Sequence, residues 1–222
     1  MFFTGGGWMY LNVNFPTPQA EYLTGRGAVT VVVDYRVYCR DGVSIVEQVK
    51  DAKAAMSWVR AHASKLGVDP HRIAAFGGSS GGHIALSTAM FEQLDNPKVE
   101  RAASSRPNLL VLFFPCVDET TEIELKYSAK AIQTYGPELS PALHVAPGLP
   151  PMFVGQGTAD PLYDENRAYC AKLIAAGDLC HMVEYQGAPH GFFRQGNAWY
   201  PAALADMDAF LVQQGYLPAR AS

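Results

Sequence analysis

Two adjacent serines lie inside a run of glycines that reads Gly-Gly-Ser-Ser-Gly-Gly over residues 77–82. Residues 78–82 fit the pattern G-x-S-x-G with Ser80 in the middle, and residues 77–81 fit it with Ser79 in the middle. This pattern is typical of a serine on a tight turn between a strand and a helix, where its hydroxyl can attack an acyl carbon. We assign the nucleophile to Ser80, because it comes one residue before the helical pattern begins.

A carboxylate and an imidazole follow two later strands. Asp160 comes after the apolar stretch 151–156, and His190 lies in a Gly/Pro loop after the stretch 181–185. Asp160 also suits the N-terminal end of a helix, and Asp118 is the second candidate for the acid. The order Ser80, Asp160, His190 is the one expected of a nucleophile-elbow triad. In that triad His190 takes the serine proton, and Asp160 holds the imidazole tautomer.

A second glycine run lies at the start of the chain, where residues 4–8 read Thr-Gly-Gly-Gly-Trp. Consecutive glycines allow backbone N–H groups to turn toward a ligand. Such donors stabilise the oxyanion that forms during acyl transfer, each by about 2.7–4 kcal/mol. Alone, this run is equally consistent with a loose N-terminal leader, and the serine motif favours the oxyanion loop.

Strand and helix patterns alternate along the chain, which predicts a mostly parallel sheet with helices on both faces in a single domain, residues 1–222. A capping-box spacing, Ser44 to Glu47, begins the longest helical pattern. The segment 116–149 is irregular and is the candidate for a small lid. We expect strands over 27–37, 72–76, 108–114, 151–156 and 181–185, and helices over 45–66, from the residue after Ser80 onward, over 162–176 and over 200–214.

The composition excludes several classes of protein. The 222 residues are 49% hydrophobic and 17% charged, with a net charge of −4, so a folded core is expected and disorder is not. No basic stripe suggests nucleic acid, and no apolar run reaches the ~18 residues that span a membrane. No signal peptide is visible, which suggests a cytoplasmic location. The four cysteines lack metal-ligand spacing, and we expect no disulfide between Cys170 and Cys180.

Beyond these patterns, the chain resembles the α/β-hydrolases of the hormone-sensitive-lipase-like, acetyl-esterase-like group. The resemblance is carried by FFTGGGW at 2–8, VDYR at 33–36, WVRAHASKLGVDPHRIAAFGGSSGGHIAL at 58–86, GQGTADPLYDENRAYCAKLIAAG at 155–177 and GAPHGFF at 187–193. It implies the α/β-hydrolase fold and ester hydrolysis without metal or cofactor. It also implies that Gly6, Gly7 and Gly81 supply the oxyanion N–H groups, with Gly5 shaping the loop.

Two departures from the family are visible. The family usually has a histidine, which braces the glycine loop, where this chain has Thr4. The family also has two further strands before the glycine motif, and here the strand that leads to Thr4 is a stub. The N-terminal strands are therefore expected to be missing. A bare sheet edge would result, and a homodimer through that edge is a hypothesis.

The leading functional hypothesis is a serine carboxylesterase that acts on small esters with short acyl groups, acetyl to butyryl, in an open and shallow site. One alternative is an amidase that resembles an arylformamidase, which uses the same triad. The other is a degenerate hydrolase that serves as a binding module.

Overall fold

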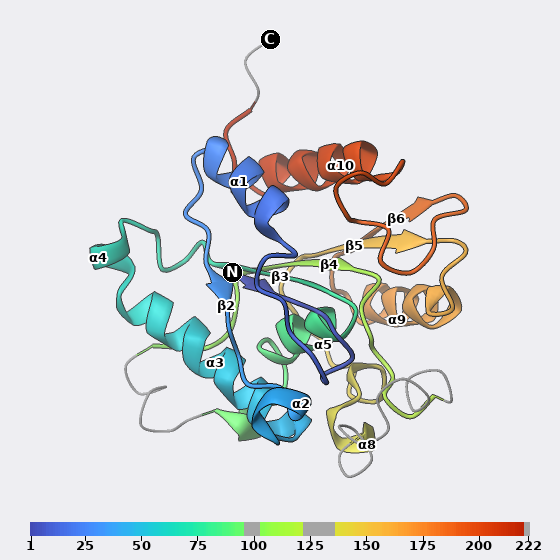
Figure 1. The fold of residues 1–222 in the computed structure, drawn as a ribbon, viewed down its shortest axis with the longest axis horizontal. Helices are drawn as coiled ribbons and strands as arrows, with labels where there is room; N and C mark the ends of the chain where they lie inside the picture. The colour runs from blue at the N-terminus through green and yellow to red at the C-terminus, as the bar shows by residue number, and fades with distance from the viewer. Residues whose placement is uncertain (96–102, 122–135, 220–222) are drawn as a thin grey trace.

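A six-stranded, fully parallel sheet forms the centre of the chain. The computed structural model describes residues 1–95, 103–121 and 136–219, and its strands follow the order β2-β1-β3-β4-β5-β6 (Figure 1). Each strand is joined to the next through a crossover, as parallel pairing requires. The strands are β1 (Phe2–Phe3), β2 (Val32–Val33), β3 (Ala74–Gly78), β4 (Leu109–Phe113), β5 (Met152–Gly157) and β6 (Cys180–Tyr185).

Helices cover both faces of this sheet. In Figure 1, α1 and α10 lie above it and α3, α5 and α9 lie below it. Two separate apolar cores match these two faces, one around α3, α5 and α9 and the other around α1 and α10. The helices are α1 (Thr17–Gly25), α2 (Tyr38–Asp41), α3 (Ile45–Ala61), α4 (Ala63–Leu66), α5 (Ser80–Ser87), α8 (Gly136–Leu139), α9 (Tyr163–Ala175) and α10 (Tyr200–Gln213), with short 3-10 turns η1 (Glu92–Leu94) and η2 (Pro141–Leu143). The predicted fold class is confirmed.

Two of the expected elements differ in length. The apolar run 27–37 forms only the two-residue strand β2, because its partner β1 offers just two residues, Phe2 opposite Val32 and Phe3 opposite Val33. The expected helix 45–66 is divided at His62 into α3 and α4. Its predicted capping box is confirmed, since the Glu47 carboxylate accepts a hydrogen bond from the Ser44 N–H at 3.1 Å.

Helix α1 was not expected from the sequence. It has a weak apolar pattern, but Pro16 precedes it and Pro18 lies in its first turn, where proline is favoured. Its buried residues Gln19, Ala20 and Leu23 pack toward the sheet.

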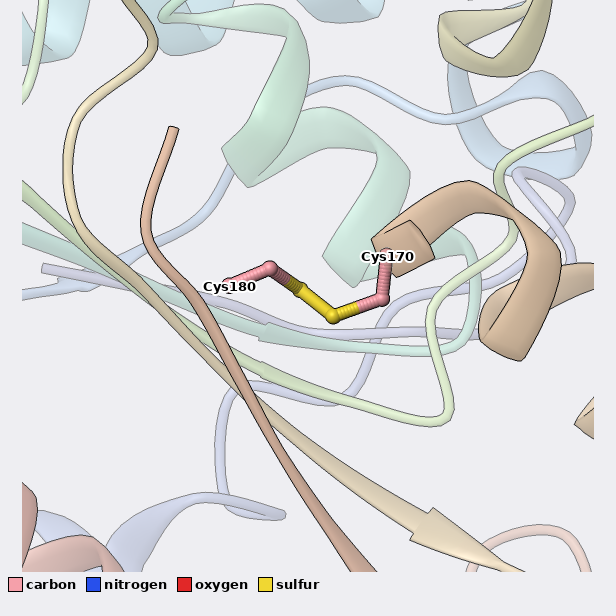
Figure 2. Close-up of a disulfide and its surroundings, with 2 residues drawn as sticks. All are labelled: Cys170 and Cys180. Atoms are coloured by element: carbon pink, nitrogen blue, oxygen red, sulfur yellow. A yellow bond between two sulfur atoms is a disulfide. The ribbon is translucent and has the colours of Figure 1, made fainter. Parts of the chain in front are cut away.

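A disulfide joins Cys170 of α9 to Cys180 of β6 (Figure 2). The expectation that these cysteines do not pair is wrong. Helix α9 and strand β6 are neighbours along the chain and pack together, which brings the two Cα atoms to 5.6 Å, a usual spacing for a disulfide. The bond connects the element that follows Asp160 to the strand that precedes His190.

Candidate active site

A strained turn joins β3 to α5 at Ser79. The backbone of Ser79 has φ 56° and ψ −133°, a conformation that L-residues rarely adopt, and α5 begins directly after it at Ser80. Such strain costs about 1–3 kcal/mol and is concentrated at functional sites. The turn presents the Ser79 side chain to the cavity at the carboxyl ends of the strands.

The glycines around this turn are required by close packing across it. A Cβ atom on Gly77 would lie 2.1 Å from the Gly81 carbonyl oxygen, so a side chain at that position would collide with the backbone. These two glycines lie two residues before and two residues after Ser79. The sharp turn is therefore centred on Ser79, and the matching G-x-S-x-G frame is 77–81.

The hydroxyl beside the imidazole belongs to Ser79. The His190 Nε2 atom lies 2.9 Å from Ser79 Oγ, and His190 Nδ1 lies 2.9 Å from Asp160 Oδ2. The assignment of the nucleophile to Ser80 is therefore corrected. It failed because Ser80 is the first residue of α5, so its side chain turns away from the cavity and is fully buried.

Asp160 makes the contact with His190 that its predicted role requires, but it does not cap α9, whose N-cap is Leu162. Its Oδ2 atom contacts His190, while Oδ1 accepts a hydrogen bond from the Leu162 N–H at 2.9 Å, just before α9. The side chain is buried, and His190 remains about two-fifths exposed. Asp118, the second candidate, instead bonds to Thr120 in an exposed turn.

Ser80 holds the glycine loop against α5. Its hydroxyl oxygen accepts a hydrogen bond from the Gly6 N–H at 2.9 Å. The loop lies so close to the helix that a Cβ atom on Gly81 would be 2.2 Å from the Phe3 carbonyl oxygen and 2.7 Å from the Gly5 nitrogen. This close approach leaves no room for a side chain and explains why residue 81 is a glycine.

Hydrogen bonds at Thr4 and Trp8 hold the two ends of the glycine loop, in which Thr4 replaces the usual histidine of the family. Thr4 is buried, and its carbonyl oxygen accepts a hydrogen bond from the Tyr35 hydroxyl. The Trp8 carbonyl oxygen accepts a hydrogen bond from Gln48 Nε2 at 2.9 Å. The Trp8 indole N–H donates to His83 Nδ1 at 3.1 Å, which joins the loop to the middle of α5. Sequence patterns gave no role to His83.

The tautomer of His83 follows from these contacts. Because Nδ1 accepts the indole hydrogen, the ring proton lies on Nε2, which is 2.9 Å from the Leu139 carbonyl oxygen. Complete burial lowers the pKa of His83 to about 4, so the ring is neutral near pH 7.

A cavity of about 300 Å³ opens in front of Ser79. Ser79, His190 and Gly6 are among its lining residues, whereas Ser80, Gly7 and Gly81 are not. Its walls are largely aromatic and include side chains that sequence patterns did not single out. Those lining residues are Phe15, Gln19, Phe113, Phe114, Phe193 and Arg194.

The described part of the segment 116–149 does not line this cavity, although its first residue, Cys116, has its Sγ atom 4.0 Å from Ser79 Oγ. None of its residues 116–121 or 136–149 is among the lining residues, and residues 122–135 lie outside the described ones. The segment that borders the cavity is instead the stretch around Phe15 to Gln19, at the start of α1.

No metal-binding group of three or more His, Cys, Asp or Glu side chains occurs within residues 1–95, 103–121 and 136–219. Over the same ranges, no helix has both the length and the apolar character needed to cross a membrane.

Comparison with known proteins places the chain in a family. The pattern of a family described as "alpha/beta hydrolase fold" matches residues 1–194. The chain belongs to this family. The strained serine and the order of the three side chains along the sequence agree with that membership.

Several curated relatives of the chain are esterases. The chain is 29% identical over 210 residues to carboxylesterase NlhH of Mycobacterium tuberculosis, a match that covers 86% of this chain and 65% of that protein. It is 26% identical over 207 residues to an arylesterase of Saccharolobus solfataricus, with 86% and 67% covered. The chain therefore spans just under two thirds of the length of NlhH.

Solved structures of one thermophilic esterase superpose closely on the chain. Thermogutta terrifontis esterase 2 phosphorylated by paraoxon is 39% identical, with a TM-score of 0.90, and the match covers 99% of this chain and 83% of that one. The propionate-bound form of the same esterase is 38% identical, with a TM-score of 0.88, and covers 99% and 84%.

Proposed function

We propose that this chain is a serine carboxylesterase in which Ser79 is the nucleophile, His190 the general base and Asp160 the residue that orients His190. The observation that carries the proposal is the continuous contact from Asp160 Oδ2 through the imidazole to Ser79 Oγ, with both distances at 2.9 Å. Such a relay activates a serine hydroxyl that is otherwise a weak nucleophile. The curated relatives and the superposed structures, which are esterases, support the same activity.

The reaction proceeds in two halves. Ser79 Oγ attacks the ester carbonyl carbon while its proton moves to His190 Nε2, which gives a tetrahedral oxyanion. The oxyanion collapses, the carbon–oxygen bond to the alcohol breaks, and the alcohol leaves with the proton from His190. Water then attacks the acyl-enzyme and gives its proton to His190, and the carboxylic acid leaves as Ser79 regains its proton.

The oxyanion donors change with the nucleophile. The residue after the nucleophile supplies one N–H group in this fold, so that donor is Ser80 rather than Gly81. The Ser80 N–H lies in the first turn of α5, where backbone N–H groups have no intrahelical acceptor. The glycine loop supplies the remaining donors, and Gly6 and Gly7 stay the candidates there: the Gly6 N–H donates to Ser80 Oγ in this structure and must turn from it to reach an oxyanion, and Gly7 is not among the lining residues of the cavity.

A preference for short acyl groups, acetyl to butyryl, is part of the proposal. The cavity of about 300 Å³ is small for a long acyl chain, and its aromatic walls suit a short apolar one. The superposed esterase of Thermogutta terrifontis is recorded in propionate-bound and butyrate-bound forms, which supports the same range.

Hydrolysis of p-nitrophenyl esters from acetate to decanoate tests this function. We expect kcat/KM to be highest between acetate and butyrate and to fall for longer chains. A faster reaction with an N-formyl anilide than with the acetate ester would instead favour an amidase. No turnover of any ester, with no labelling by a fluorophosphonate, would favour a binding module.

The location and the oligomeric state stay predictions. The disulfide Cys170–Cys180 weighs against the expected cytoplasmic location, because disulfides are rare in reducing compartments. Cell fractionation tests the location.

Strand β2 lies at one end of the sheet with Val32 and Val33 half-buried, which suits pairing with a second copy. A monomeric mass by light scattering at micromolar concentration would contradict the homodimer.

A further inference from the structure

The cavity in front of Ser79 carries an unbalanced charge. Among the described residues that line it, the one permanently charged side chain is Arg194, and none is Asp or Glu. The other walls are mainly phenylalanine rings and glycine backbone. A cationic group at an otherwise apolar wall attracts an anionic group of a ligand with little competition from neighbouring acids.

Arg194 differs from the paired arginines of the chain. In the described residues, Arg26, Arg36 and Arg40 form ion pairs with aspartates, and Arg194 forms none. Its guanidinium instead lies over the Phe15 ring, 4.8 Å from the centroid. Stacking on a ring leaves the edge N–H donors of a guanidinium available for a carboxylate.

The backbone around Arg194 is held in place. The Phe193 carbonyl oxygen accepts a hydrogen bond from Gln19 Nε2 at 3.0 Å, and the Arg194 N–H donates to the Phe192 carbonyl oxygen at 2.8 Å. Gln19 is buried and belongs to α1, so the helix fixes the peptide that carries Arg194. Arg194 follows His190 by four residues and lines the same cavity as Ser79, so both side chains border the space that a bound ester would occupy.

We infer that Arg194 is a specificity-determining residue that selects esters with a carboxylate, such as the half-esters of short dicarboxylic acids. The inference rests on the proposed esterase function and specifies its substrate class. The Arg194 guanidinium donates hydrogen bonds to the substrate carboxylate while Ser79 attacks the ester carbonyl.

Paired substrates with and without a charged carboxylate test the inference. The mono-p-nitrophenyl ester of glutaric acid places a carboxylate on the acyl side, and p-nitrophenyl butyrate is its neutral counterpart. The pair 4-acetoxybenzoate and methyl 4-acetoxybenzoate places the carboxylate on the alcohol side. One of the two pairs places its carboxylate at Arg194. For that pair, we expect Arg194→Met to lower the ratio of kcat/KM for the charged substrate to kcat/KM for the neutral one by about fivefold to tenfold, as for loss of one partly exposed charged hydrogen bond.

The controls separate this site from a general effect of charge. Arg167→Met removes the same charge from the exposed surface of α9, away from the cavity, and should leave both ratios unchanged. Arg194→Lys keeps the charge and should retain part of the preference. The wild-type preference should also weaken as salt rises from low to high concentration. Equal ratios in the wild type and Arg194→Met for both substrate pairs would overturn the inference.

A binding measurement keeps this test independent of catalysis. Calorimetry with monomethyl glutarate on Ser79→Ala should show binding that weakens about fivefold to tenfold when Arg194→Met is added. If the wild type hydrolyses no ester, the proposed function fails while this measurement still decides the role of Arg194. No binding to Ser79→Ala, or equal binding with and without Arg194→Met, would overturn the inference.

Discussion

The contact between Gly81 and the glycine loop allows a sharp test of the oxyanion site. In Gly81→Ala the new Cβ atom would lie 2.2 Å from the Phe3 carbonyl oxygen, whereas real Cβ contacts essentially never fall below 3.0 Å. Either the chain at residues 3–5 or the start of α5 must therefore move by at least about 0.8 Å, the difference between these two distances, which displaces the glycine loop relative to the Ser80 N–H. The N–H group of residue 81 and the side chains of the triad are unchanged by this substitution.

A displacement of this size is large for catalysis. Misplacing a catalytic group by about 1 Å can lower the rate about 10²-fold, and loss of one oxyanion donor lowers kcat by about 10²–10³-fold. We expect Gly81→Ala to lower kcat for p-nitrophenyl butyrate about 10²-fold. KM should change little, since the lining side chains of the cavity remain.

Gly25→Ala is the matched control, because Gly25 lies in α1 and a Cβ atom there meets nothing within 4 Å. It should keep kcat and the melting temperature close to the wild type. Circular dichroism and thermal melting establish that Gly81→Ala is folded before its rate is interpreted. A folded Gly81→Ala protein with wild-type kcat would refute the assignment of residues 4–8 to the oxyanion site.

Three further outcomes are expected. Asp160→Asn should lower kcat for p-nitrophenyl butyrate by about 10⁴-fold through the wrong imidazole tautomer, and a drop below tenfold would contradict the role of Asp160. Burial lowers the pKa of His83 to about 4 in the folded protein, so below a pH of about 6.5 this histidine is protonated in the unfolded chain before it is protonated in the folded one. The free energy of unfolding in urea should therefore be about 2 kcal/mol lower at pH 5 than at pH 7 because of this group. The same loss in His83→Gln would contradict this. Opening the disulfide, with its sequence separation of 10 residues, by Cys170→Ala with Cys180→Ala should cost about 2–3 kcal/mol in urea unfolding, and unchanged stability would contradict it.

Much of the active site was predictable because parallel strands end at one edge of the sheet. Asp160 and His190 each follow a strand, β5 and β6, and the common direction of those strands brings the two side chains together. The sequence alone led to the wrong serine, because Ser79 and Ser80 both fit the same motif and the helix starts at Ser80, one residue earlier than its pattern indicates. The deciding fact is the packing of Gly77 against Gly81, which is visible only in three dimensions.

Other features depend on contacts that no local pattern reports. The pairing of Cys170 with Cys180 requires the packing of α9 on β6. The cavity wall brings Phe15 and Arg194 together from opposite ends of the chain. Helix α1 was missed because its apolar residues lack a clear period, and its tertiary packing on the sheet determines it.

The identity of the nucleophile is the central claim, and Ser79→Ala compared with Ser80→Ala tests it most directly. Both proteins are treated with a fluorophosphonate, the labelled peptide is located by mass spectrometry, and hydrolysis of p-nitrophenyl butyrate is measured. We expect Ser79→Ala to lose labelling and to lose kcat by about 10³-fold or more. Ser80→Ala should still be labelled at Ser79 and should lose at most about tenfold, since it removes only the hydroxyl that holds Gly6. Labelling at Ser80, or full activity in Ser79→Ala, would contradict the assignment.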